Sequence, residues 1–272
     1  MNRMTFSRIF PLVVLLAACT NNDASEPDNG LVNIPAPAPL SYTLIRTYPH
    51  DTASFTQGLV FHNGVLYEST GNPDNIANNG SWLGPVNIEN GMRIPKATLP
   101  AAEFGEGMTI LNGKVYQLTW QNKKGYVYDL ATFKKTGEFT YNHDGWGITN
   151  DGIHLIVSDG SSNIYFWDPA TFKEVKRLSI RDNRGLKNNL NELEFIRGSL
   201  YANVWQTSQV YRIDTASGYV TGVLDLSDLL RAYPELQRPP ADVPNGIAWD
   251  SSGQRLFLTG KKWPLLFEVQ LP

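Results

Sequence analysis

Short apolar runs rich in β-branched and aromatic residues fill the chain from about residue 41 to its end. Asn-Gly, Asp-Gly and Ser-Gly pairs separate these runs, and such pairs between apolar stretches are typical of β-hairpins. The 3.6-residue periodicity of amphipathic helices is nearly absent. The pattern therefore predicts an all-β domain.

Three stretches align with one another: FTQGLVFHNGVLYESTG from Phe55, FGEGMTILNGKVYQLTW from Phe104, and NLNELEFIRGSLYANVW from Asn189. In each, a polar residue precedes an apolar strand, a turn glycine follows seven positions later, and a tyrosine comes three positions after that. Looser copies begin at Asp144 and Val243, and each copy continues into a third strand. Five such units, about 40–54 residues apart, predict a five-bladed β-propeller.

Two other fold classes fit the pattern less well. A parallel βαβ fold needs crossover helices, and a β-sandwich would not give repeats in matched register. The last copy ends at Pro272 without a fourth strand, while the strand-like segment 42–50 has no partner of its own. We expect this N-terminal strand to complete the last blade and close the ring, which leaves no free edge there.

The N-terminus is typical of a bacterial lipoprotein signal. Arg3 and Arg8 precede an apolar stretch, residues 9–18, which is too short to span a bilayer. The run Leu16-Ala17-Ala18-Cys19 resembles a lipobox, so residues 1–19 are predicted to be a lipoprotein signal peptide with Cys19 as the lipidated residue. The alternative is an ordinary secretory signal in which the cysteine is incidental.

The segment that follows is polar and then rich in proline and alanine. Residues 20–40 are expected to form a flexible tether, and residues 41–272 the propeller domain. Thr20 rather than aspartate follows the cysteine, which favours the outer membrane. We expect a periplasmic protein held on the bacterial cell envelope by the lipid on Cys19.

Composition narrows the function. The 272 residues carry a net charge of −3, which argues against a nucleic-acid-binding protein. The 42% hydrophobic content is sufficient for a large core, and the single cysteine excludes an intrachain disulfide. The unpaired edges of propeller blades are short, so we expect a monomer.

Candidate chemistry lies where the repeats converge. In a propeller the innermost strands line a central channel, so matched positions meet at one end of the axis. The position just before the inner strand, called the slot here, holds Gln57, Glu106, Trp146, Asn191 and Asn245. The return of the next strand brings Gly71, Trp120, Asp159, Trp205 and, within one position, Lys261.

An acid, an amine, amides and tryptophans that face one cavity are typical of a binding or catalytic pocket. Each residue also has a structural interpretation. A tryptophan near a strand end is often core, Glu106 could simply pair with Lys261, and the asparagines could cap turns. These alternatives stay open at the level of the sequence.

The motifs SFTQGL, FGEGMT, QLTWQ, GWGIT, SDGSS, LNELE, YANVW, NGIAWD and TGKKWP together resemble the plant and bacterial type of glutamine cyclotransferase, from about residue 41 to the end. The resemblance implies a five-bladed propeller that converts N-terminal glutamine to pyroglutamate with release of ammonia, without a catalytic zinc or other cofactor. It implies a site formed by Phe55, Gln57, Phe104, Glu106, Trp120, Trp146, Asn191, Trp205 and Lys261. The loop 71–85 departs from the family pattern.

This chemistry assigns a role to each residue. Glu106 would act as proton shuttle, with a pKa raised by the aromatic wall of Phe104 and the tryptophans. Lys261, Asn191 and Gln57 would stabilise the oxyanion. The aromatic residues Phe55, Phe104, Trp120, Trp146 and Trp205 would bind the glutamine side chain.

Two other functions remain. One is a non-catalytic periplasmic lipoprotein that binds peptides or acts as an assembly scaffold. The other is a metal-dependent propeller hydrolase. One strong acid beside a lysine makes a poor calcium site, and no two histidines share a motif that could hold zinc. The expected partners are peptides or proteins with N-terminal glutamine.

Overall fold

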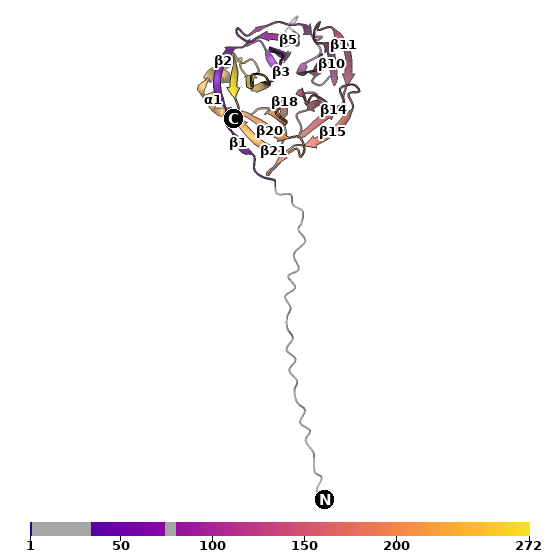
Figure 1. Ribbon diagram of the computed structural model, residues 1–272, viewed down its shortest axis with the longest axis vertical. Coiled ribbons are helices and arrows are strands. Elements are labelled where there is room, and N and C mark those ends of the chain that lie inside the picture. Colours follow the sequence, from indigo (N-terminus) through magenta and orange to yellow (C-terminus); the bar gives the residue numbers. More distant parts are fainter. Residues whose placement is uncertain (2–33, 74–79) are drawn as a thin grey trace. The chain divides into compact units, whose positions relative to one another are not determined.

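Five antiparallel sheets surround a central axis in the computed structural model, which describes residues 34–73 and 80–272 together with Met1. This arrangement, shown in Figure 1, confirms the predicted five-bladed propeller. The first blade contains β3 (Phe55–His62), β4 (Val65–Gly71), β5 (Trp82–Asn87) and β6 (Met92–Arg93), with β7 (Ala97–Thr98) also paired to β5. The second contains β8 (Gly105–Leu111), β9 (Lys114–Thr119), β10 (Lys124–Asp129) and β11 (Lys135–Thr140).

The remaining blades repeat this order from the axis outward. The third contains β12 (Ile148–Asn150), β13 (Leu155–Ser158), β14 (Asn163–Trp167) and β15 (Glu174–Ser179). The fourth contains β18 (Leu190–Ile196), β19 (Ser199–Val204), β20 (Gln209–Asp214) and β21 (Val220–Asp225), after a small hairpin of β16 (Arg181–Asp182) and β17 (Gly185–Leu186). The fifth contains β22 (Pro244–Asp250), β23 (Arg255–Gly260) and β24 (Leu265–Gln270).

The repeated turn glycines fold the first two strands of a blade into a hairpin. Asn63 and Gly64 have φ angles of 48° and 82°, and Asn112 and Gly113 have φ angles of 53° and 72°. Two successive positive φ angles define the tight hairpin turn that Asn-Gly sequences favour. The aligned turn glycine predicted from the repeats therefore has a direct structural cause.

An N-terminal strand closes the ring, as the sequence predicts. Strand β2 (Thr43–Pro49) pairs antiparallel with β24, from Thr43 opposite Gln270 to Pro49 opposite Leu265. The first and last segments of the domain thus share one sheet, and β24 has no free edge.

The tether boundary predicted at residue 40 is wrong at its C-terminal end. Strand β1 (Ala38–Leu40) pairs in parallel with β21, and the side chain of Leu40 covers Gly222. The outer edge of β21 offers unpaired backbone groups, which this short strand satisfies. The compact unit begins at Ile34. The predicted signal peptide with Cys19, and residues 20–33 of the tether, lie outside the described residues.

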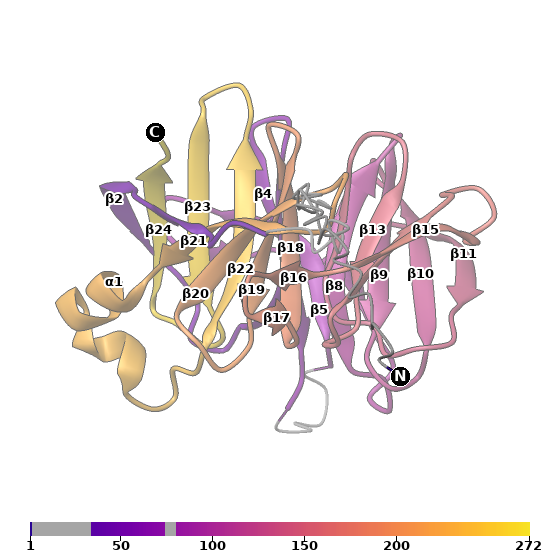
Figure 2. The ribbon, with the colours of Figure 1, turned by 90° about the horizontal axis from the view of Figure 1, so that it is seen from below.

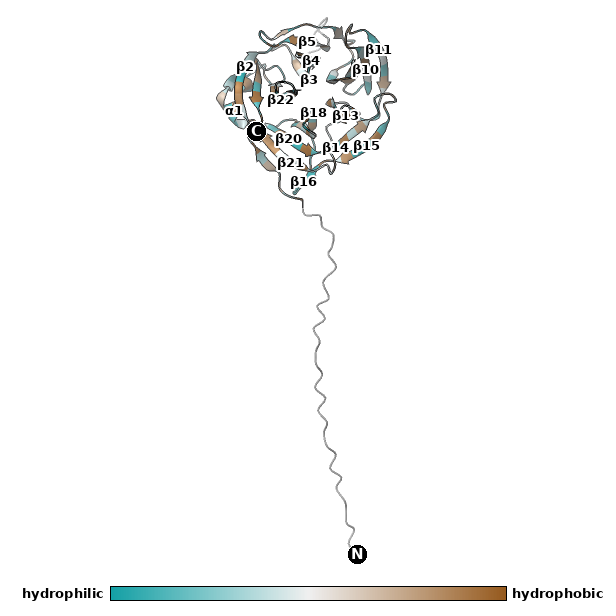
Figure 3. Cartoon of the chain, in the orientation of Figure 1, coloured by the Kyte–Doolittle hydropathy of each residue, from teal (hydrophilic) through white to brown (hydrophobic). Residues whose placement is uncertain are grey.

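The core lies between neighbouring blades. Each hydrophobic cluster joins two adjacent sheets. One contains Leu59 of the first blade and Phe257 of the fifth, and another contains Leu118 of the second blade and Leu155 of the third. Figure 3 shows the apolar stretches along the strands of the ring. Because the sheets pack face to face, the inner strands are held at fixed distances around the axis.

Two buried acids on β18 link the fourth blade to the first, third and fifth blades. The carboxylate of Glu192 accepts the backbone N–H of Leu59 on β3 at 3.2 Å and of Ile247 on β22 at 2.8 Å. Glu194 accepts the N–H of Trp249 at 2.9 Å and the hydroxyl of Thr149 at 3.2 Å. Burial raises the pKa of Glu194 to about 8.

A short helical segment was not expected from the sequence. Helix α1 (Ser227–Ala232) and the 3₁₀ turn η1 (Pro234–Gln237) connect β21 to β22 and lie beside the last blade (Figure 2). Leu229 and Leu236 bury their side chains in the cluster that contains Phe267. In the part of the chain that the structure describes, no helix has the length and apolar character needed to cross a membrane.

Candidate active site

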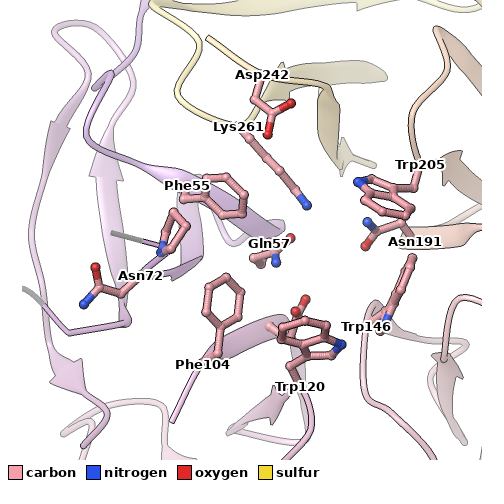
Figure 4. A pocket seen from close by; sticks show the side chains of 12 residues that line it. Phe55, Gln57, Asn72, Phe104, Trp120, Trp146, Asn191, Trp205, Asp242 and Lys261 are labelled. Carbon is pink, nitrogen blue, oxygen red and sulfur yellow. The ribbon is translucent and has the colours of Figure 1, made fainter. Parts of the chain in front are cut away.

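A cavity of about 470 Å³ opens at one end of the inner strands (Figure 4). All nine pocket residues predicted from the sequence line it, together with three that the sequence did not indicate. The lining residues are Phe55, Gln57, Asn72, Pro73, Phe104, Glu106, Trp120, Trp146, Asn191, Trp205, Asp242 and Lys261.

β-Bulges set the position of the slot residues. In the pairing of β3 with β4, β8 with β9, and β18 with β19, the register shifts across Gln57, Glu106 and Asn191, respectively. A bulge leaves a residue without a ladder partner and turns its side chain away from the alternating faces. The slot side chains therefore reach the cavity while the rest of each inner strand remains paired.

Hydroxyls of the preceding blade hold two slot residues by their backbone. The hydroxyl of Ser69 donates to the carbonyl oxygen of Glu106 at 2.6 Å, and that of Ser158 donates to the carbonyl oxygen of Asn191 at 2.7 Å. These hydrogen bonds cross from one blade to the next. They fix the main chain from which the catalytic candidates project.

A glycine after the slot permits close packing of the inner strands. The amide of Gly107 donates to the carbonyl oxygen of Trp146 at 2.8 Å, and a Cβ at residue 107 would lie 2.7 Å from that oxygen. A larger residue would push the second and third blades apart. The glycine in the motif around Glu106 thus serves backbone approach.

Glu106 is buried in surroundings that disfavour the charged form of its side chain. It is 4% exposed, and burial raises its pKa well above the ordinary value. Lys261 partly opposes that rise, and Asp144 adds to it. Near-complete burial beside apolar rings disfavours the charged carboxylate, so this group holds its proton to higher pH than an exposed glutamate does.

Lys261 is the basic residue of the cavity. It is 5% exposed, and burial lowers its pKa, although the nearby charges of Glu106 and Asp242 oppose that effect. Its ammonium nitrogen points into the cavity (Figure 4), 4.8 Å from the centre of the Phe55 ring. Among the described residues, no ion pair within 4.0 Å joins Lys261 to Glu106, so the structural pairing considered from the sequence is not formed.

Aromatic rings form two walls of the cavity. Phe104 packs edge-on against Phe55, with ring centres 6.0 Å apart, and against Trp120 at 5.9 Å. On the other side, Trp146 and Trp205 meet at 5.5 Å with their planes 85° apart. Edge-to-face contacts of this kind hold the rings rigidly. The two walls leave a narrow gap between them that is suited to a small, flat group.

Two buried polar atoms of the cavity lack partners within the described part of the chain. They are the indole nitrogen Nε1 of Trp146 and the side-chain oxygen Oδ1 of Asn191. A buried donor or acceptor without a hydrogen bond is costly, and such atoms in a cavity indicate where a ligand binds. One of these two atoms is a hydrogen-bond donor and the other an acceptor.

Three matched positions fall outside the cavity. Asn245 donates from its side-chain amide to Gln57 Oε1 at 3.2 Å and supports the slot from behind. Asp159 accepts the hydroxyl of Tyr165 at 2.8 Å, and Gly71 provides the flat surface on which the Phe104 ring packs. The repeats identified the right positions in the ring, but these three serve as supports.

The sequence missed three lining residues, Asn72, Pro73 and Asp242. Asn72 and Pro73 follow β4, at the beginning of the loop that departs from the family pattern. Asp242 precedes β22, outside the aligned repeats, and its backbone N–H donates to the carbonyl oxygen of Lys261 at 2.9 Å. The proximity of Asp242 to Lys261 follows from tertiary structure, so no local sequence signal could have shown it.

Metal ligands are not clustered in residues 34–73 and 80–272. No group of three or more histidine, cysteine, aspartate or glutamate side chains there is arranged to hold a metal ion. The charged and amide side chains that line the cavity are the carboxyl groups of Glu106 and Asp242, the ammonium of Lys261 and the amides of Gln57, Asn72 and Asn191. This set is suited to proton transfer and to hydrogen bonding of a neutral polar ligand.

Comparisons with known proteins identify one family that this chain resembles. A family model described as glutamine cyclotransferase matches residues 12–271. The chain is 38% identical over 230 residues to a glutaminyl-peptide cyclotransferase of Arabidopsis thaliana, which covers 84% of this chain and 70% of the plant protein. The crystal structure of glutaminyl cyclase from Myxococcus xanthus matches with a TM-score of 0.77 and 35% identity, over 86% of this chain and 98% of that protein.

Proposed function

Because the chain belongs to the glutamine cyclotransferase family, we propose that it is a glutaminyl-peptide cyclotransferase. In this reaction an N-terminal glutamine of a peptide or protein becomes pyroglutamate and ammonia is released, which places the enzyme among the aminoacyltransferases. The observation that carries the proposal is the pair of Glu106 and Lys261, buried and unpaired in one aromatic cavity. A site that only bound peptides would have no need for an acid and a base with shifted pKa values.

The reaction forms one bond and breaks another at the same carbon. The α-amino nitrogen of the substrate attacks the side-chain amide carbon, and the C–N bond to the amide nitrogen then breaks. The attack is intramolecular, so the enzyme has to select the folded conformer of the substrate. An α-amine with an ordinary pKa of ~7.7–8 is partly neutral at physiological pH and can act as the nucleophile.

Glu106 moves the proton. As a carboxylate it takes a proton from the attacking amine, and as an acid it delivers that proton to the departing amide nitrogen, which leaves as ammonia. The raised pKa of Glu106 suits both steps, because general acid–base catalysis is most effective when the pKa lies near the working pH. The carboxyl group ends in its starting state.

Lys261 and Gln57 stabilise the charge that develops on the amide oxygen. The ammonium of Lys261 points into the cavity, and burial strengthens its interaction with an oxyanion (Figure 4). The Oε1 atom of Gln57 accepts a hydrogen bond from Asn245, which turns the amide nitrogen of Gln57 away from Asn245. Both donors are therefore set before substrate arrives.

Recognition of the substrate carboxamide uses the two unpartnered atoms. The Nε1 group of Trp146 is a donor for the amide oxygen, and the Oδ1 atom of Asn191 is an acceptor for an amine or amide hydrogen. The walls of Phe55, Phe104, Trp120 and Trp205 exclude water around them. We propose that the reaction needs no metal, since Glu106 and Lys261 between them supply proton transfer and charge stabilisation.

We also propose the cellular placement from the sequence. Lipidation of Cys19 would anchor the protein to the periplasmic face of the outer membrane, and peptides or proteins with N-terminal glutamine would be its substrates. The support is the lipobox-like run that ends in the single cysteine. The structure does not describe these residues.

The test is ammonia release from a glutamine-initiated dipeptide in the presence of excess EDTA. We expect stoichiometric ammonia and pyroglutamyl product, with the same rate when EDTA is omitted. The alternative function, a non-catalytic peptide-binding or scaffold lipoprotein, predicts binding without product. Loss of activity on chelation would contradict the proposed metal independence.

A further inference from the structure

A second buried charged cluster lies behind the cavity, between the first and fifth blades. The imidazole of His50 and the carboxylate of Glu68 are both almost fully buried, with Nε2 of His50 3.2 Å from Oε1 of Glu68. Neither residue lines the cavity. A buried ion pair contributes little to stability compared with apolar packing, so stability alone does not explain this pair.

The histidine ring is fixed on both sides by acceptors. Its Nδ1 atom lies 2.8 Å from the carbonyl oxygen of Trp263, and its Nε2 atom faces Glu68. Burial by itself lowers the pKa of His50, but Glu68 and the Trp263 carbonyl outweigh it, so the pKa is raised. Both ring nitrogens therefore face a hydrogen-bond acceptor, which fixes the orientation of the ring.

The carboxylate of Glu68 binds the residues on either side of Phe55. It accepts the hydroxyl of Thr56 at 2.6 Å and the hydroxyl of Ser54 at 3.2 Å. Phe55, between them, is the residue whose ring lies against the ammonium of Lys261. Glu68 thus fixes the start of β3 from behind.

Residues 50–54, which precede β3, are hydrogen-bonded to the turn that carries Lys261. The turn runs from Gly260, the last residue of β23, to Leu265, the first residue of β24. His50 donates its backbone N–H to the carbonyl oxygen of Pro264 at 2.8 Å, and Lys262 donates its backbone N–H to the carbonyl oxygen of Ser54 at 2.7 Å. With the His50 ring on Trp263, three hydrogen bonds tie residues 50–54 to this turn.

We propose that His50 and Glu68 are positioning residues that act together as a clamp, holding Lys261 against Phe55 at the geometry needed for oxyanion stabilisation. The clamp joins the two sides of the cavity that come from opposite ends of the chain, the start of β3 and the turn after β23. It touches no substrate and works through the turn. The proposal rests on the proposed cyclotransferase function for its kinetic consequence, but the clamp itself is a property of the folded protein.

Two substitutions at His50 separate its two hydrogen bonds. His50→Asn retains a donor near the position of Nδ1 and can still bind the Trp263 carbonyl. His50→Gln retains a donor near the position of Nε2 and can still bind Glu68. Because Trp263 belongs to the turn of Lys261, we expect His50→Gln to lower kcat by roughly 10–100-fold, the range for a small misplacement of a catalytic group, and His50→Asn to lower it less. A purely structural role would make kcat follow the melting temperature in both variants.

A double-mutant cycle with Lys261→Met tests whether the clamp acts through the lysine. We expect His50→Gln to have little further effect on kcat when Lys261 is already methionine. Glu68→Gln provides a second entry to the same cycle if His50→Gln fails to fold. His154→Gln is the matched control. Like His50, His154 pairs with an acidic side chain, but its partner is Asp151 and the pair lies in a part-exposed turn of the third blade. An equal loss of kcat in both lysine backgrounds would overturn the proposal.

A readout without turnover keeps the clamp separate from the proposed function. Lysines carrying ¹³C-methyl groups after reductive methylation give NMR signals, and the signal of Lys261 is assigned by its loss in Lys261→Met. We expect this signal to shift in His50→Gln and Glu68→Gln but not in His154→Gln. If the wild-type protein released no ammonia, the shift would still support the clamp while the enzymatic proposal failed. An unchanged Lys261 signal in folded His50→Gln and Glu68→Gln would overturn the clamp.

Discussion

The ammonium nitrogen of Lys261 lies 4.8 Å from the centre of the Phe55 ring, within the range of a cation–π contact. This contact keeps the buried cation in place without an ion pair to Glu106 among the described side chains. Both groups consequently face the cavity with their charges uncompensated by direct contact.

We expect Glu106→Gln to reduce kcat by roughly 10²–10⁴-fold with little change in KM, because glutamine keeps the size but cannot carry the proton. The folded-state pKa of Glu106 is raised, so ionisation of this buried acid destabilises the folded protein. The destabilisation grows as pH rises above the pKa that Glu106 has in the unfolded chain. Glutamine removes that cost, and the melting temperature at pH 8 should stay the same or rise. Circular dichroism melts beside ammonia-release kinetics measure both effects.

Glu138→Gln is the control for that experiment. Glu138 is an exposed acid that pairs with Lys135 on β11, the outermost strand of the second blade, and it does not line the cavity. Its replacement should leave kcat and melting temperature near wild type. A folded Glu106→Gln protein that cyclises substrate at the wild-type rate would remove Glu106 from the mechanism.

For Lys261→Met we expect kcat to fall by about 10²–10³-fold, the typical loss when an oxyanion donor is removed. Burial lowers the pKa of Lys261, so the charged ammonium destabilises the folded protein at low pH. The free energy of unfolding therefore rises as pH increases from the folded-state pKa toward the pKa of the unfolded chain. Methionine removes the buried charge, so the melting temperature at pH 7 should not fall. A large loss of stability with unchanged kcat would make Lys261 a structural residue.

The pH dependence of stability should report Glu194, away from the cavity. Its folded-state pKa of about 8 exceeds the unfolded value, so the folded protein keeps a proton that the unfolded chain loses above its own pKa. Stability from this group therefore falls as pH rises from about 4.5 to 8. We expect Glu194→Gln to flatten the melting temperature over that window, and an unchanged slope would contradict the assignment.

The repeats explain why so much of the site could be predicted. Matched positions in a propeller converge by symmetry, so aligning Glu106 with Gln57, Trp146 and Asn191 located the cavity without any coordinates. Asp242 could not be found in this way, because it lies in a connecting segment whose course depends on helix α1 and the chain after it. That helix has six residues, too few for a periodic apolar signal.

Strand β1 escaped prediction for a different reason. Proline and alanine dominate residues 34–39 and give no alternation of apolar and polar positions. The pairing is specified by its partner, since β21 presents an open edge and Gly222 leaves room for Leu40. The clamp of His50 and Glu68 is likewise invisible in the sequence, because 18 positions separate its two members.

Truncation tests ring closure. A chain that begins at Ile34 keeps every described strand, and we expect it to fold and to cyclise substrate. A chain that begins at Ser41 loses only β1 and should remain folded with a lower melting temperature. A chain that begins at Asp51 also loses β2, which leaves β24 as an exposed edge, and it should aggregate. Soluble, active protein from the last chain would refute closure by β2.

Membrane attachment is tested at Cys19. If this residue is lipidated, Cys19→Ser should release the protein from the membrane fraction and leave its specific activity unchanged, since the proposed active-site cavity is lined by residues between 55 and 261. Cell fractionation with immunodetection measures the first effect and ammonia release the second. Continued sedimentation of the serine variant with membranes would refute the lipid anchor.

The bulges that present Gln57, Glu106 and Asn191 have a consequence for how the protein can evolve. Each of these residues lies where the ladder of its inner strand slips, so its side chain takes no part in cross-strand pairing. The glycine or the hydroxyl that supports each position acts on the backbone and is indifferent to the side chain. Selection can therefore exchange the reactive groups one at a time while the ring keeps its register. A substitution that changes the chemistry of the cavity then need not disturb the residues that make the propeller fold.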